Sequence, residues 1–188
     1  MDFDEMKGLL AARLKRSRYE HSLGVAETAV CMAKRFGADV EKARIAGLLH
    51  DCAREYTNDK MLEEADKRGI VYSSVERSMP LLLHAYIGAV RIHECYGVDD
   101  EEIAQAIYRH TVGGSHMTIL DKIIYFADMI EPNRNYPGVE HLRRIVRQKS
   151  LDEAVLAGLS QSIAFVLKKE HLIHPDTVIA RNEILLKE

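Results

Sequence analysis

Apolar residues recur with helical spacing along almost the whole chain, and no segment alternates between apolar and polar residues as a half-buried strand would. The breaks between apolar runs are short and contain Gly, Pro, Asn or Ser, which favour turns. The pattern therefore predicts an all-α protein with about eight or nine helices. We expect helices near residues 4–15, 17–36, 39–50, 58–69, 80–97, 99–111, 118–132, 150–169 and from 177 onward.

Residues that typically begin or end helices support several of these boundaries. Gly37 follows the second apolar run, and glycine is common just past the C-terminus of a helix. Asp99 with Glu102, and Ser150 with Glu153, have the three-residue spacing of a capping box. These signals predict helices that start close to residues 99 and 150.

The composition fits a single domain over residues 1–188, because a chain of this length with 47% apolar residues can bury one core but is short for two. The 26 basic and 29 acidic residues are spread along the chain, so we expect no nucleic-acid partner and no membrane partner. The N-terminus lacks the features of a signal peptide, and no apolar run approaches the ~20 residues of a membrane span. We therefore expect a cytoplasmic protein.

The three cysteines form no CxxC pair and are odd in number, which disfavours both a disulfide framework and a thiolate zinc site. We expect Cys31 and Cys95 to serve as small apolar side chains that fill space.

The chain has nine histidines, and helical periodicity separates those that point inward from the others. His21 shares a helical face with Val25, and His110 continues the apolar face of the helix before it. His84 lies one turn into an apolar helix, whereas His93 is about half a revolution away from it and is expected to face solvent.

Carboxylates accompany these histidines at positions where the pattern predicts burial. Asp51 directly follows His50 at the end of an apolar helix, and Asp128 follows the apolar run ILDKIIYFA. A buried carboxylate is costly unless a cation neutralises it. The predicted inward-facing set is His21, His50, Asp51, His84, His110 and Asp128.

Neutral imidazole and carboxylate are the ligands that suit divalent transition metals. Six ligands exceed the needs of one open catalytic ion, whereas two ions bridged by Asp51 would use them all and leave room for water and substrate. A set of unrelated core histidines is the alternative. The adjacent pair His50 and Asp51, with four further inward ligands, favours a metal centre.

This pattern of H, HD, H, H and D on helices resembles the HD-domain superfamily of metal-dependent phosphohydrolases, and longer strings resemble its YqeK family. The strings are RYEHSLGVAETA at 18–29, HDCARE at 50–55, HTVGGSHMTILDKIIYFADMIEPNR at 110–134 and HPDTVIARN at 174–182. The resemblance implies an HD-domain helical bundle and a symmetrical bis(5′-nucleosyl)-tetraphosphatase that cleaves diadenosine tetraphosphate into two ADP. It also implies one or two divalent metal ions, iron first with manganese or cobalt as alternatives, and water activated by the metal as the nucleophile.

The resemblance also assigns roles to individual residues. His21, His50, Asp51 and Asp128 would hold the main metal, and His84 and His110 would complete a second site with Asp51 between them. Catalysis would fall to His50, Asp51 and Arg54, where Arg54 stands in place of a lysine expected in many relatives. Substrate contacts would come from the ligands His21, His84, His110 and Asp128, and from Arg54, Thr111, Arg134, His171, His174 and Asp176.

Simpler interpretations of some residues stay open. Asp121 could accept a hydrogen bond from a ligand histidine or could cap its own helix, and Asp176 could do no more than cap the last helix. The arginines could be solvated charges.

Other functions stay open as well. Another HD nucleotide phosphohydrolase, such as a nucleotidase or an alarmone hydrolase, is one alternative, although HDCARE differs from the HDxxED typical of alarmone hydrolases. A non-catalytic sensor of metal and nucleotide is a second, and a purely structural helical module is a third. The apolar helices and the resemblance leave room for a homodimer.

Overall fold

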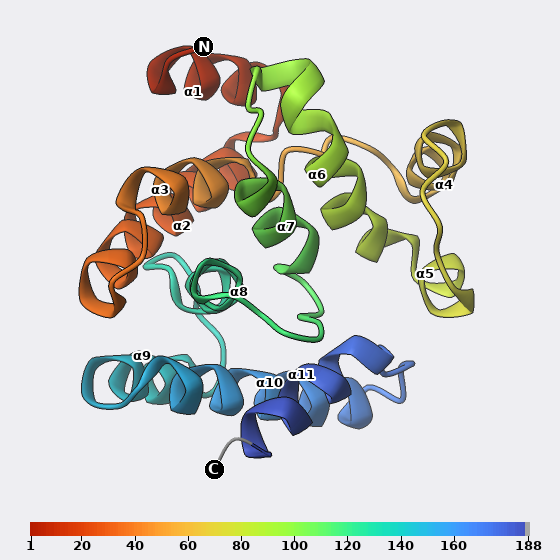
Figure 1. Cartoon of the computed structure of the whole chain (residues 1–188). Coiled ribbons are helices and arrows are strands. Elements are labelled where there is room, and N and C mark those ends of the chain that lie inside the picture. Colours follow the sequence, from red (N-terminus) through yellow and green to blue (C-terminus); the bar gives the residue numbers. More distant parts are fainter. Residues whose placement is uncertain (187–188) are drawn as a thin grey trace.

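The computed structural model describes residues 1–186, and within that range the chain forms α-helices joined by short loops, with no β-strand (Figure 1). The predicted all-α class is therefore confirmed. The helices are α1 (Phe3–Arg13), α2 (Arg16–Phe36), α3 (Val40–Leu49), α4 (Asn58–Lys67), α5 (Ser74–Ser78), α6 (Leu83–Tyr96), α7 (Glu101–Arg109), α8 (Ile119–Ile130), α9 (Val139–Gln148), α10 (Leu151–Lys168) and α11 (Pro175–Leu185), with a 3₁₀ turn at Pro80–Leu82. Residues 187 and 188, which the single-domain prediction includes, lie outside the described part.

The predicted count of eight or nine helices is too low, because residues 1–186 contain eleven. The two additional helices are α5 and α9. Helix α5 has five residues and is too short to show a periodic pattern. Helix α9 buries Val139, Leu142 and Val146 but is otherwise highly charged, and it begins at Gly138 without a side-chain cap.

Two predicted caps lie at neighbouring residues. Asp100, and not Asp99, caps α7 by accepting hydrogen bonds from the backbone N–H groups of the second and third helical residues. His174, and not Asp176, caps α11, because its Nδ1 accepts from the backbone N–H of Asp176 and Pro175 occupies the first helical position.

The two cysteines expected to fill space differ in their surroundings. Cys95 is half-buried and packs against the core, as predicted. Cys31 lies exposed on α2, so that prediction is wrong: its position lies outside the face of the helix that the buried residues Val25, Ala29 and Met32 share.

Helix α8 is the central element of the fold and contacts α2, α3, α7, α9 and α10 (Figure 1). Residues 120–127 of this helix are all buried, and Ile123, Ile124 and Phe126 are fully enclosed. Helices α9, α10 and α11 lie along one side of α8, and α4 and α5 lie at the outer edge next to α6. In residues 1–186, no helix combines the length and apolarity needed to cross a bilayer.

Helices α2 and α3 approach each other closely because both have small residues at their contact. A Cβ on Gly47 of α3 would lie 2.8 Å from the Cα of Ala26 in α2, a distance that no side chain tolerates. Because of this close packing, the C-terminal end of α3, where His50 stands, lies next to α2.

We expect Gly47→Ala to lower the free energy of unfolding by about 1–3 kcal/mol, because the backbone of α2 must move away. Gly8→Ala in α1 is the matched control, since a Cβ there meets nothing within 4 Å. This control should leave stability equal or raise it by about 0.5–1 kcal/mol through better helix propensity. Urea denaturation followed by circular dichroism measures both, and equal stabilities for the two variants would contradict the packing described.

Candidate metal centre

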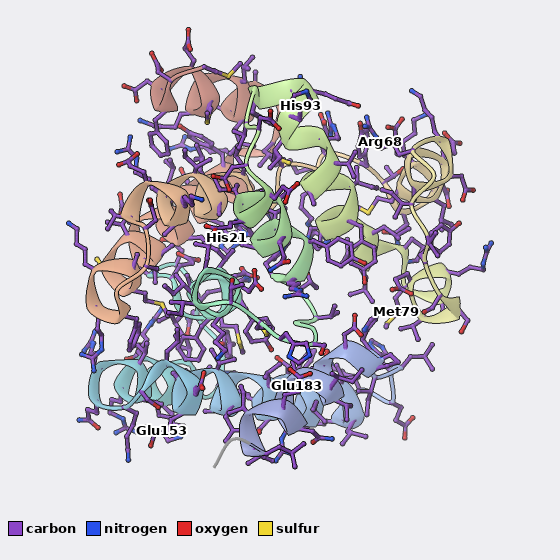
Figure 2. The ribbon with its side chains drawn as sticks, viewed as in Figure 1. His21, Arg68, Met79, His93, Glu153 and Glu183 are labelled. Atoms are coloured by element: carbon purple, nitrogen blue, oxygen red, sulfur yellow. The ribbon has the colours of Figure 1, made fainter. Side chains whose placement is uncertain are left out.

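The six predicted ligands converge in the interior from five separate segments. His21 lies on α2, Asp128 lies in the last turn of α8, His84 lies in the first turn of α6, His50 and His110 stand at the C-caps of α3 and α7, and Asp51 follows His50. Five of them are buried, and the Asp128 side chain is 21% exposed. In Figure 2, His21 lies inside the molecule, whereas His93 lies at its outer edge with a side chain that is 69% exposed, as predicted.

The four histidines all turn the same ring nitrogen toward the centre. His50 donates its Nδ1–H to the carbonyl oxygen of Gly47 at 2.8 Å, and His110 donates to that of Ile107 at 2.7 Å. His84 donates in the same way to Leu81. Because a carbonyl oxygen only accepts, the proton of each neutral ring is on Nδ1, and Nε2 carries a lone pair.

These lone pairs face one another at short distances. The Nε2 atoms of His84 and His110 are 3.1 Å apart, and those of His21 and His50 are 3.2 Å apart. Two lone pairs at such a distance repel unless a proton or a metal ion lies between them. The arrangement therefore fits a cation, and the mixture of imidazole nitrogen and carboxylate oxygen suits a divalent transition metal.

Asp51 lies between two pairs of histidines. Its Oδ2 is 3.4 Å from Nε2 of His50 and 3.8 Å from that of His21, whereas its Oδ1 is 3.1 Å from Nε2 of His84 and 3.8 Å from that of His110. The carboxylate can thus serve two ion positions, one with each oxygen.

Groups of three donors with ligand atoms within 4.8 Å of one another describe the same centre in residues 1–186. These groups are His21, His50 and Asp51; His50, His110 and Asp128; and Asp51, His84 and His110. They overlap at His50, Asp51 and His110, so the donors form one connected centre.

The electrostatics of the centre keep the carboxylates charged and favour a cation beside them. Burial alone would raise the pKa of Asp51 and Asp128, but neighbouring histidines hold both pKa values well below the usual range. Burial and repulsion from His50 and His84 lower the pKa of His110 to about 3, so its ring stays neutral. Burial opposes a charge on His50, yet the two carboxylates outweigh it and raise the pKa of His50.

Three arginines stand next to the carboxylates of the centre. Arg18 on α2 donates to Oδ2 of Asp51 at 2.8 Å, and Arg134 forms an ion pair with Asp128. Burial and repulsion from Arg18 and Arg134 lower the pKa of Arg54, and within residues 1–186 its guanidinium makes no hydrogen bond or close ion pair. A half-buried cation without a paired anion is suited to bind an anionic ligand.

The remaining predicted contacts divide into two groups. The hydroxyl of Thr111 lies within the centre, 3.1 Å from Nε2 of His110. His171 and Asp176 flank the start of α11 instead, and His174 bonds a carboxylate oxygen of Glu76 at 2.8 Å. These three residues contact none of the six ligands, and their role toward a nucleotide stays a prediction.

Sequence reasoning missed two residues that contact the ligands of the centre. Arg18 precedes His21 by nearly one turn, so the periodicity of α2 could have placed it on the same side of the helix. Glu131 accepts a hydrogen bond from Nδ1 of His21 at 3.1 Å across 110 residues of sequence, and no local pattern indicates such a contact. Asp121 caps α8 and pairs with Arg109, and it does not contact a ligand histidine.

The chain is similar to known proteins over most of its length. The model of the family described as HD domain matches residues 18–133. A protein of Halalkalibacterium halodurans named symmetrical bis(5′-nucleosyl)-tetraphosphatase is 40% identical over 96% of this chain and 95% of its own, and one of the same name from Bacillus subtilis is 36% identical over 97% of both. A crystal structure of a predicted HD superfamily hydrolase involved in NAD metabolism, from Clostridium acetobutylicum, superposes with a TM-score of 0.95 and 38% identity, and covers 100% of this chain and 99% of its own.

We expect a saturating divalent ion such as Mn²⁺ to raise the melting temperature of the wild-type protein by about 5–10 °C, because a ligand at 100 times its Kd stabilises the folded state by about 2.7 kcal/mol. His84→Ala should reduce this gain. His93→Ala, on the same helix but facing solvent, should retain it. Differential scanning calorimetry with and without the ion measures the shift. An equal rise in melting temperature in both variants would show that His84 does not bind the ion.

Proposed function

The chain belongs to the HD domain family and to its symmetrical bis(5′-nucleosyl)-tetraphosphatases, and we propose on that premise that it hydrolyses dinucleoside tetraphosphates to two nucleoside diphosphates. Diadenosine tetraphosphate is the substrate we assign, with ADP as the product. The observation that carries the proposal is the convergence of four Nε2 lone pairs and two carboxylates in a chain whose full-length relatives have this name.

We assign iron as the metal, with manganese and cobalt as ions that the same donors would accept, since imidazole suits several of these metals. His21, His50, Asp51 and Asp128 would hold one ion, and Asp51, His84 and His110 a second. When bound, such ions lower the pKa of water and polarise a phosphoryl oxygen, which makes water a competent nucleophile near neutral pH.

The arginines give the chain its own means of holding the tetraphosphate. Arg54 has no paired anion among the described residues, and Arg18 and Arg134 are only partly buried, with side chains 30% and 33% exposed. A planar guanidinium can donate two parallel hydrogen bonds to phosphate oxygens. The three side chains would neutralise the bridge and orient it toward the centre.

The reaction does not require a dedicated general acid to protonate the leaving group. The oxygen of water bonds to one of the two central phosphorus atoms, and the bond from that phosphorus to the central bridging oxygen breaks with its electron pair on the leaving ADP. Because a terminal phosphate has a second pKa near ~6, ADP is a good leaving group at neutral pH. The phosphorus that receives the oxygen becomes the terminal phosphate of the other ADP. One proton of water passes to solvent, and the second leaves that phosphate according to its pKa.

Several finer assignments belong to the same proposal. His171, His174 and Asp176 would contact a nucleoside, and Thr111 a phosphate near His110. We place the enzyme in the cytoplasm, as a single domain that acts on a small nucleotide and can associate as a homodimer.

We expect the protein, loaded anaerobically with Fe²⁺ or with Mn²⁺, to convert diadenosine tetraphosphate to ADP as the only product. Anion-exchange chromatography separates ADP from ATP and AMP. Asp51→Ala should abolish turnover because both ion positions lose a ligand, while circular dichroism should show intact helices. ATP plus AMP would mean a different cleavage position, and no reaction with any ion would favour a nucleotide sensor.

Arg18 offers a test of the phosphate contacts on a single helix. We expect Arg18→Ala to lower kcat/KM by about 10–100-fold, as the loss of a charged hydrogen bond typically does. Arg16→Ala is the matched control, because the Arg16 side chain is 91% exposed and pairs with Glu20. If steady-state kinetics gave the same values for both variants, Arg18 would not be a substrate contact.

A further inference from the structure

Glu131 is a buried carboxylate that touches the metal centre without belonging to it. The residue is 1% exposed and stands at the C-terminal end of α8, three residues after Asp128. One carboxylate oxygen accepts from Nδ1 of His21 at 3.1 Å, and the other accepts from the backbone N–H of Asn133 at 2.7 Å. Within residues 1–186, no lysine or arginine forms an ion pair with this carboxylate.

His21 needs such an external partner because of its place in the fold. His50 and His110 stand at helix C-caps, where the last carbonyl groups have no partner in the helix, and each donates to one of these carbonyls. His21 lies inside the 21-residue helix α2, where the carbonyl groups are already used by the helix itself. Its Nδ1–H therefore bonds a charged carboxylate, whereas the other three rings bond neutral carbonyl oxygens.

The chain leaves room for this contact at Gly24. A Cβ on Gly24 would lie 2.5 Å from Oε2 of Glu131, so any larger residue would displace the carboxylate. Glycine inside a helix is destabilising relative to alanine, and Gly24 is buried in the middle of α2. Its presence there is explained by the space that Glu131 occupies.

The main chain of Glu131 is also held. Nη2 of Arg143 on α9 donates to the carbonyl oxygen of Glu131 at 2.6 Å, and Nε of the same arginine donates to that of Ile130 at 2.9 Å. The backbone of Glu131 is thus held by α9, and its carboxylate is held by His21 and the Asn133 loop.

We propose that Glu131 is a positioning residue that orients His21 and strengthens ion binding at the position that His21 shares with His50, Asp51 and Asp128, while leaving the position at His84 and His110 unchanged. A carboxylate behind a ligand histidine fixes the tautomer and makes the ring a stronger donor. This inference rests on the metal centre of the proposed function and not on the identity of the substrate.

The test is a Mn²⁺ titration of metal-free protein, with free Mn²⁺ measured by electron paramagnetic resonance. Glu131→Gln keeps the size of the side chain and removes its charge. We expect it to weaken the binding of one ion by about 10–100-fold and to leave the other unchanged. Glu76→Gln is the matched control, because it removes another buried carboxylate that bonds a histidine, His174, outside the centre.

A second variant reaches the same contact from the opposite side. Gly24→Ala should displace the Glu131 carboxylate and weaken the same ion, whereas Gly8→Ala should not. Unchanged affinity for every ion in both Glu131→Gln and Gly24→Ala would overturn the proposal, as would a wild-type protein that binds no ion. Loss of one ion in Glu131→Gln together with no ADP from the wild-type protein would overturn the proposed function and leave this inference standing.

Discussion

The Nε2 atoms of four buried histidines face one another at short distances in the interior of this protein, and the fold holds each ring in that orientation. Three of the four central histidines are anchored by Nδ1 to carbonyl oxygens, two of them at helix ends, and the fourth is anchored to Glu131. Each anchor directs Nε2 inward. A proton or a metal ion between the Nε2 atoms removes the repulsion, and the donor set is therefore consistent with a cation at this place.

Helix α8 connects this centre to the rest of the molecule. Its apolar residues pack against five other helices, and its last turn and C-cap contribute Asp128 and Glu131. The helices that carry His21, His50 and His110 all pack against it. A displacement of α8 would therefore disturb the carboxylate, the histidines and the partner of His21 together.

The sequence is sufficient to predict the helical class and the six converging side chains, because an inward position is a local property of a periodic helix. It is insufficient for contacts that depend on how helices are placed. In the sequence, Glu131 has the features of an ordinary residue at the end of a helix, and its partner His21 is 110 residues away. Periodicity also fails to predict α5, which is very short, and α9, which is mostly charged. His174 and not Asp176 is the cap of α11, because Pro175 fixes where that helix begins.

The wide separation of the ligands along the chain has a consequence for how the protein matures. His21 appears early during synthesis, whereas Asp128 and Glu131 appear after more than half of the chain has been made. A nascent chain on the ribosome therefore lacks a complete set of donors until α8 has emerged and packed against α2. An ion that binds all six donors at once can therefore be captured only after about two thirds of the chain has been synthesised, because Asp128 is the last of the six in the sequence.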